Sequence, residues 1–401
     1  MIRLSDRIQE VAPSATFAIK AKAASLRAEG RSIVDLSAGE PDGTPPAEAS
    51  AAGLAAIEAG ENHYAPLAGL PELREAIARS YDAAGCSYSA DNVLVTMGGK
   101  QALYNLFQVL FGPGDEVIAF SPYWVSYPPQ IQLAGAKMVL VRTRPEDGFQ
   151  PDLESVRAAI TDRTRAILVN SPSNPTGCLV ERERLIGLDR LAAEHDLIVI
   201  SDEIYSALTY DGAVADCFAS LSPESPERTV LVDAVSKTYA MTGWRVGWAV
   251  GPVPIIKACA KLQGHSTSGV CLINQRAALA AITAPGDFLT PIRAALVERR
   301  DLLAAGLDAL DGISVGPIAQ GAFYLFPRVD GLFGRRRPGG GVLQTAMDVA
   351  DFFLTDGGVA VVPGEAFGED RCVRVSYALS RDAVEEGLRR MATALSLLQP
   401  G

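Results

Sequence analysis

The sequence lacks long apolar runs, has only three histidines and contains no Cys-x-x-Cys pair. No apolar stretch approaches the roughly 20 residues that a helix needs to span a bilayer. The N-terminus, MIRLSDRIQE, is charged and lacks the apolar core of a signal peptide. The six cysteines are scattered, which fits free thiols in a cytoplasmic protein better than a disulfide framework. His63, His195 and His265 are too far apart to suggest a metal site. We therefore expect a cytoplasmic protein with no membrane segment and no metal.

An excess of basic residues is also missing. The chain has 36 Lys and Arg against 47 Asp and Glu, a net charge of −11. Binding to nucleic acid needs clustered basic side chains that neutralise phosphates, so we expect no nucleic-acid partner. The one basic cluster, GRRRPGGG at 334–341, lies among glycines and is more typical of a solvated loop.

What the sequence does contain, from about residue 90 to 250, is an alternation of short β-rich runs with helical patterns. The runs are NVLVTMGG, DEVIAF, AKMVLVRT, TRAILVNSP, DLIVISDE, TVLVDAVS and VGWAVG. Such alternation predicts an α/β fold with a largely parallel sheet between two layers of helices. At 401 residues the chain is long enough for two domains. We predict a large domain over 45–285 and a smaller α+β domain made of 1–44 and 286–401.

Polar residues follow several of these strands. Asp202 comes directly after the run LIVI, with Tyr205 shortly beyond, and Asn174 lies in the loop NSPSNPTG. Lys237 and Arg245 lie in AVSKTYAMTGWRVGW, between two apolar runs. Ligands of parallel α/β sheets collect at the carboxyl ends of the strands. We therefore expect these five side chains to share one site.

The stretch TMGGKQAL ends a strand in two glycines and opens a helix. Backbone N–H groups at a helix start attract anions, and glycines allow a phosphate to approach closely. Each feature has an ordinary alternative when it is taken alone. A glycine pair is often only a tight turn, a strand-end aspartate is often an N-cap, and buried aromatics usually belong to the core. The combination is what indicates a site.

Pyridoxal phosphate chemistry needs this combination. A lysine amine forms a Schiff base with the cofactor aldehyde. A carboxylate beside the pyridine nitrogen keeps that nitrogen protonated, so that the ring acts as an electron sink. A phenol and a carboxamide bond the ring oxygen, while a helix start and an arginine hold the phosphate. The expected cofactor is therefore pyridoxal 5'-phosphate.

The chain also resembles a known family. The motifs that carry the resemblance are PSATFAIKAKA, SAGEPD, HYAPLAGLPELREAIA, GGKQALYNLFQ, SPYWVSYP, NSPSNPTG, SDEIY, SKTYAMTGWRVGW, GAFYLFP, GVAVVPGEAFG and VRVSYA. In this order they resemble the class I pyridoxal-phosphate aminotransferases of fold type I, and most closely the bacterial aspartate/prephenate aminotransferase subfamily. The resemblance implies a seven-stranded, mostly parallel sheet in the large domain. It also implies a homodimer whose active sites lie at the subunit boundary.

The resemblance implies a role for individual residues. Lys237 would be the Schiff-base lysine and the base that moves the substrate proton, and Asp202 would pair with the pyridinium. The other implied cofactor contacts are Asn174 and Tyr205 at the ring oxygen, Trp124 stacked on the ring, Gly99, Lys100, Gln101 and Arg245 at the phosphate, and Tyr64 from the partner subunit. Ser236 is a candidate for one phosphate hydrogen bond, because Ala234 replaces the Ser or Gly that is common there. Arg374 would bind the substrate α-carboxylate, with the Gly39 backbone beside it.

Three segments depart from the subfamily pattern near the expected substrate side chain. Ala12 replaces a basic residue before PS, EPDGTPP is one residue shorter than usual around 43–46, and 263–276 brings in His265 and Asn274. Lys100 is retained, and in dicarboxylate-specific relatives this lysine approaches the distal carboxylate. The predicted reaction is amino transfer between an L-amino acid and a 2-oxo acid by a ping-pong mechanism. An acidic donor, aspartate or glutamate, is one hypothesis. The alternative is a lyase, decarboxylase or synthase on the same scaffold.

Overall fold

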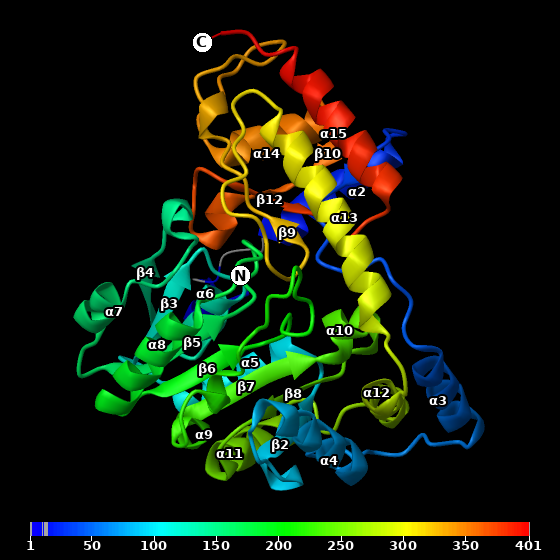
Figure 1. The fold of residues 1–401 in the computed structure, drawn as a ribbon, viewed down its shortest axis with the longest axis vertical. Coiled ribbons are helices and arrows are strands. Elements are labelled where there is room, and N and C mark those ends of the chain that lie inside the picture. The colour runs from blue at the N-terminus through cyan, green and yellow to red at the C-terminus, as the bar shows by residue number, and fades with distance from the viewer. Residues whose placement is uncertain (1, 10, 12–14, 401) are drawn as a thin grey trace.

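The computed structural model describes residues 2–9, 11 and 15–400, and its centre is a seven-stranded sheet in the order β2-β8-β7-β6-β5-β3-β4 (Figure 1). The strands are β2 (Val93–Thr96), β3 (Glu116–Ser121), β4 (Lys137–Arg142), β5 (Thr164–Asn170), β6 (Ile198–Asp202), β7 (Thr229–Ala234) and β8 (Gly247–Val250). Strands β4, β3, β5, β6 and β7 run parallel. The predicted α/β fold with a mostly parallel seven-stranded sheet is confirmed.

Strand β8 is the exception, since it runs antiparallel to both of its neighbours, β7 and β2. The cross-strand pair Ala234↔Gly247 brings the carboxyl end of β7 next to the amino end of β8. Lys237 follows β7 and Arg245 precedes β8, so both lie at the same edge of the sheet. The sequence interpretation treated Arg245 as following a strand. It reaches the carboxyl edge only because β8 is reversed.

Helices cover both faces of the sheet, because successive strand residues point to opposite sides. On β7, Val230 and Val232 pack with α5 (Gly99–Leu110), α6 (Tyr127–Leu133) and α11 (Val253–Gly264). Leu231, between them, belongs to the core on the other face. That core includes α4 (Pro71–Ser80), α7 (Leu153–Ala159), α8 (Arg182–Glu194) and α12 (Leu272–Thr283). The remaining helices around the sheet are α3 (Ala47–Glu58), α9 (Ser225–Arg228) and α10 (Val235–Thr238).

The rest of the chain builds a second core above the carboxyl edge of the sheet (Figure 1). It contains the antiparallel sheet β11 (Val362–Pro363), β12 (Val373–Ser376) and β9 (Tyr324–Leu325), and the parallel pair β1 (Val34–Asp35) and β10 (Val359–Ala360). Its helices are α13 (Leu289–Asp308), α14 (Ala346–Thr355) and α15 (Arg381–Leu395). Figure 1 shows the long α13 running from α14 and α15 down towards α10 and α12.

The N-terminal segment supplies α1 (Asp6–Gln9) and α2 (Ala15–Ala28). Ile19 and Ala23 of α2 pack against Leu354 and Ala360 near the end of α14 and in β10. Elsewhere on α2, Lys22 forms an ion pair with Asp351 of α14, and Ser25 is exposed. The register of α2 on this core therefore sets which of its polar side chains turn towards the sheet edge.

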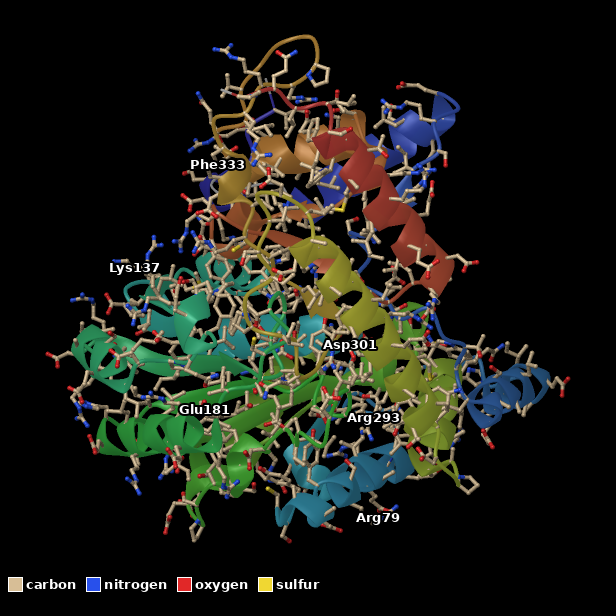
Figure 2. All side chains as sticks on the ribbon, turned by 45° about the horizontal axis from the view of Figure 1, so that its top comes forward. Arg79, Lys137, Glu181, Arg293, Asp301 and Phe333 are labelled. Carbon is tan, nitrogen blue, oxygen red and sulfur yellow. The ribbon has the colours of Figure 1, made fainter. Side chains whose placement is uncertain are left out.

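The outer surface carries charged side chains, for example Arg79 and Lys137 (Figure 2). In the basic cluster at 334–341, Arg337 donates hydrogen bonds to Asp351 and Asp356, and Arg335 donates to Asp311, so at least two of its three arginines are engaged within the chain. Across the described ranges, no helix has the length and apolar character to cross a membrane. The same ranges contain no group of three or more His, Cys, Asp or Glu side chains arranged to hold a metal.

Candidate active site

A cavity of about 460 Å³ lies where the carboxyl edge of the large sheet meets the second core. It is lined by Gly39, Gly99, Lys100, Trp124, Asn174, Asp202, Tyr205, Ser236, Lys237, Arg245 and Arg374, together with residues from other segments. Eleven of the thirteen residues singled out from the sequence therefore meet in one place.

Lys237 lies in α10, the single turn that follows β7. Its Nζ donates a hydrogen bond of 2.5 Å to the carbonyl oxygen of Gly39. Burial lowers the pKa of the Lys237 amine to about 8. At neutral pH roughly a tenth of the amine is therefore neutral, far more than for an ordinary lysine, and the neutral form is what a nucleophilic or proton-moving lysine needs.

Asp202 ends β6 and is only 4% exposed. One carboxylate oxygen, Oδ2, accepts a 2.7 Å hydrogen bond from the Tyr127 hydroxyl, and Oδ1 accepts from the Ile204 N–H at 3.3 Å. Burial is the main reason why the Asp202 pKa is raised to about 6, and the Tyr127 hydrogen bond acts against it. A cation next to Asp202 would stabilise the charged carboxylate and so offset the desolvation caused by burial.

Arg374 reaches the cavity from β12 of the second core and is 3% exposed. It donates to Asn174 Oδ1 at 3.0 Å and to the Ser37 carbonyl oxygen at 2.9 Å, one bond from each terminal nitrogen. Each terminal nitrogen therefore retains a second N–H, and the buried Nε has no hydrogen-bond partner. A buried guanidinium with unused donors fits an incoming carboxylate.

A chain of hydrogen bonds extends from Arg374 through Asn174 to two tyrosines. The Asn174 amide donates to the Tyr205 hydroxyl at 3.4 Å, and that hydroxyl lies 3.0 Å from the Tyr324 hydroxyl. Burial raises the pKa of Tyr205 well above its ordinary value, so the phenol stays protonated. The carboxamide and the two phenols therefore line the cavity as neutral groups next to the Arg374 cation.

Another part of the cavity lining is built to receive an anion. Gly98, at φ +80°, is the N-cap of the twelve-residue helix α5. The Arg245 guanidinium lies so close that a Cβ added to Gly98 would sit 2.7 Å from Arg245 Nη2. Arg245 itself adopts a left-handed conformation at φ 54° and donates to the Thr242 carbonyl oxygen at 2.7 Å. A helix N-terminus and a guanidinium thus converge on one point.

Lys100 and Trp124 form another side of the cavity. The Lys100 Nζ lies 4.9 Å from the centre of the Trp124 ring, and burial, assisted by the Arg245 charge, lowers the Lys100 pKa. The Trp124 ring meets Tyr127 edge-on with 5.4 Å between ring centres. This contact holds the indole in a fixed orientation.

Two predicted residues do not line the cavity. Gln101 accepts from the Met97 N–H at 2.6 Å and donates to Thr267 at 2.6 Å, so it supports the loop before α5. Tyr64 is 97% exposed on the surface of the chain.

The three departing segments also lie away from the cavity where they are described. Ala12 falls outside the described residues. Asp42, next to the 43–46 segment, pairs with Arg299 at 2.8 Å, and Asn274 donates to the Trp244 carbonyl oxygen. His265 is exposed at the end of α11. Among the described residues of these segments, none lines the cavity formed by this chain.

The structure adds residues that the sequence reasoning missed, among them Lys20, Glu40, Asn170 and Tyr324. Asn170 ends β5, and the rule that polar strand ends form sites could have found it. It donates to the Asp202 carbonyl oxygen at 2.9 Å and accepts from the Asn174 N–H at 2.8 Å, which ties two strand ends together. No local signal marks Lys20, Glu40 or Tyr324, because their positions depend on packing between segments far apart in sequence.

The donor set fits pyridoxal phosphate. A buried amine with a lowered pKa, a buried carboxylate, an oriented indole and an anion cradle occupy separate sides of a single cavity. The close approach of Arg245 to Gly98 leaves no room for a side chain at that glycine, as expected where a phosphate lies against backbone.

Comparisons with known proteins agree with this chemistry. The family model for aminotransferase class I and II matches residues 31–391. The aspartate/prephenate aminotransferase of Thermus thermophilus is 45% identical over 396 residues, covering 98% of each chain. Among solved structures, the aspartate aminotransferase from Rhizobium meliloti aligns with a TM-score of 0.95 at 38% identity, covering 100% of both chains. Thermus thermophilus aspartate aminotransferase with maleate aligns with a TM-score of 0.91 at 44% identity, covering 98% of this chain and 100% of that one.

Proposed function

The chain belongs to the class I and II aminotransferases, and we propose from this premise a specific role for each residue of the cavity, an acidic amino donor and a homodimeric assembly. The protein is a pyridoxal-phosphate-dependent aminotransferase, which moves an amino group between an amino acid and a 2-oxo acid. The observation that carries the residue roles is the convergence of Lys237, Asp202, Arg245 and Arg374 on one cavity.

The cofactor-binding roles follow from the chemistry of each group. Pyridoxal phosphate, when bound, supplies an aldehyde that takes up the amino group and a ring that accepts the electron pair released at the substrate Cα. Arg245, Ser236 and the start of α5 at Gly99 would hold the phosphate. Asp202, oriented by Tyr127, would hold the protonated ring nitrogen. Trp124, Asn174 and Tyr205 would fix the ring between them.

The substrate roles depend on two cations. Arg374 would bind the α-carboxylate with the unused N–H groups of its guanidinium, with Asn174 as its fixed neighbour. Lys237 would then remove the proton from the substrate Cα and return it at the next step, since burial has brought its pKa to about 8. Lys100, on the Trp124 side of the cavity, would face the substrate side chain. This excess of positive charge favours an acidic donor, aspartate or glutamate.

The assembly proposed is a homodimer in which Tyr64 of each chain serves the site of the other. Tyr64 is 97% exposed, and Leu54 and Ile57 of the neighbouring α3 are 62% and 59% exposed. A cluster of large exposed apolar side chains is typical of a surface that another protein covers. We also propose the domain division at residues 44/45 and 285/286. A cytoplasmic location is proposed because all six cysteines are free.

Isotope transfer tests the function and the donor together. The cofactor-loaded protein is mixed with one ¹⁵N-labelled amino acid and a panel of 2-oxo acids, and each new amino acid is analysed by mass spectrometry. We expect the label to move from aspartate or glutamate to a 2-oxo acid, and no transfer with Lys237→Ala. Transfer only from neutral donors would refute the acidic donor. Release of carbon dioxide or a side-chain fragment instead of labelled product would point to the lyase or decarboxylase alternative, which the comparisons do not favour.

A further inference from the structure

Lys20 of α2 lines the cavity, although it is distant in sequence from every other residue there. Its Nζ lies 3.7 Å from Glu40 Oε1, while Glu40 Oε2 accepts a 2.8 Å hydrogen bond from Thr242. Glu40 directly follows Gly39, whose carbonyl oxygen holds the Lys237 amine. The Lys20–Glu40 pair therefore lies close to the reacting lysine.

The balance of charge in the cavity leaves Lys20 without an assigned partner among the cofactor and substrate groups. The charged lining side chains are Lys20, Lys100, Lys237, Arg245, Arg374, Glu40 and Asp202. In the proposed function, Arg245, Lys237 and Asp202 would hold the cofactor, and Arg374 would bind the substrate α-carboxylate. Lys20 and Lys100 then face Glu40 alone, so one positive charge remains for an anionic substrate side chain.

The contact between Lys20 and Glu40 is loose enough to exchange. At 3.7 Å the two atoms are beyond a hydrogen bond, and the two side chains are 39% and 58% exposed. Exposed pairs of this kind contribute little to stability. Lys22, two residues further along α2, is held differently, since it forms a hydrogen-bonded ion pair with Asp351 away from the cavity.

We propose that Lys20 is a specificity-determining residue that binds the distal carboxylate of a dicarboxylic substrate. When the bound side chain is uncharged, Lys20 pairs with Glu40 instead. This proposal rests on the proposed function and names its substrate class. A ping-pong enzyme receives two different side chains in one cavity, and an exchangeable Lys20–Glu40 pair lets the same cavity accept an acidic one and a neutral one without leaving a charge unpaired.

Binding of unreactive ligands tests the proposal without turnover. Succinate and butyrate share a four-carbon chain and differ by one carboxylate. Their dissociation constants are measured by calorimetry on the cofactor-loaded wild type, Lys20→Ala, Glu40→Gln and the control Lys22→Ala. Loss of one charge-assisted hydrogen bond should weaken succinate binding to Lys20→Ala roughly tenfold and leave butyrate unchanged. Glu40→Gln should tighten succinate binding, because Lys20 then binds succinate without first breaking its ion pair with the Glu40 carboxylate. Lys22→Ala should match the wild type.

Several outcomes would overturn the proposal: equal weakening of both ligands in Lys20→Ala, no change in either, or weaker succinate binding in Glu40→Gln. A steady-state comparison separates this failure from failure of the proposed function. If the wild type transfers no ¹⁵N from any donor but Lys20→Ala still loses succinate selectivity, the proposed function fails and the assignment of Lys20 stands. If transfer from aspartate and glutamate relative to a neutral donor is the same in wild type and Lys20→Ala, the assignment fails and the function stands.

Discussion

The hydrogen bond from the Tyr127 hydroxyl lowers the pKa of Asp202 against the larger effect of burial, and its removal should make cofactor binding depend more steeply on pH. The hydroxyl donates to Asp202 Oδ2 at 2.7 Å, and Tyr127 is 2% exposed. Tyr127→Phe keeps the ring and its edge-on contact with Trp124 and deletes only this donor. The variant therefore isolates one hydrogen bond to a buried carboxylate.

The magnitude follows from the energy of that bond. A hydrogen bond to a charged group is worth about 1.5–3 kcal/mol, and one pH unit of pKa corresponds to about 1.4 kcal/mol. The Asp202 pKa, about 6 in the wild type, should therefore rise by roughly one to two pH units in the variant. In the proposed function the cofactor ring nitrogen pairs with the ionised carboxylate, so affinity should fall as the pH drops through this pKa. The loss begins at higher pH in the variant.

The assay is a cofactor titration of the apo-protein between pH 5.5 and 9, followed by quenching of tryptophan fluorescence. The ratio of the dissociation constants, variant over wild type, should be near one at pH 9 and should rise to roughly tenfold or more below pH 6. Titration of the cofactor phosphate and of Lys237 affects both proteins and cancels in the ratio. Tyr123→Phe, which removes a half-buried tyrosine hydroxyl that is not hydrogen-bonded to Asp202, is the control. A ratio that does not change with pH would refute the reasoning.

Two further substitutions test the cradle and a second buried carboxyl group. A Cβ at Gly247 would lie 2.5 Å from the Gly99 nitrogen, so Gly247→Ala should displace the start of α5 and weaken cofactor binding at least roughly tenfold, whereas Gly112→Ala, with only ordinary contacts, should not. Burial raises the Glu203 pKa to about 7, so the native state holds a proton that the unfolded state loses, and this group lowers stability as the pH rises from about 4.5 to 7. Glu203→Gln should therefore stabilise the fold relative to wild type more at pH 8 than at pH 5, by up to about 3 kcal/mol of unfolding free energy. The measurement is the thermal midpoint of both proteins at the two pH values. An equal shift at both pH values would contradict the linkage.

Much of the site was visible in the sequence because its signals are local. A strand ending in a polar residue, as at Asp202, depends only on the alternation of nearby side chains and on where the apolar run stops. The glycine pair before α5 is likewise a local signal, because the backbone conformation at the start of this helix favours glycine. The cofactor and the mostly parallel sheet were predicted from such signals, and the family from the resemblance of its motifs in their order; each is confirmed.

The remaining features depend on contacts between distant segments. The antiparallel direction of β8 brings Arg245 beside Lys237 and Gly98, and nothing in the local sequence of β8 predicts that direction. Arg374 meets Asn174 only because the second core packs over the sheet edge. Lys20 reaches the cavity because α2 packs on β10. This packing brings a helix near the N-terminus close to residues that follow strands of the large sheet, far along the chain. Local sequence determined which groups were available for catalysis, and only the long-range packing of the chain decided which of them share a cavity, because that packing is a property of the whole folded core.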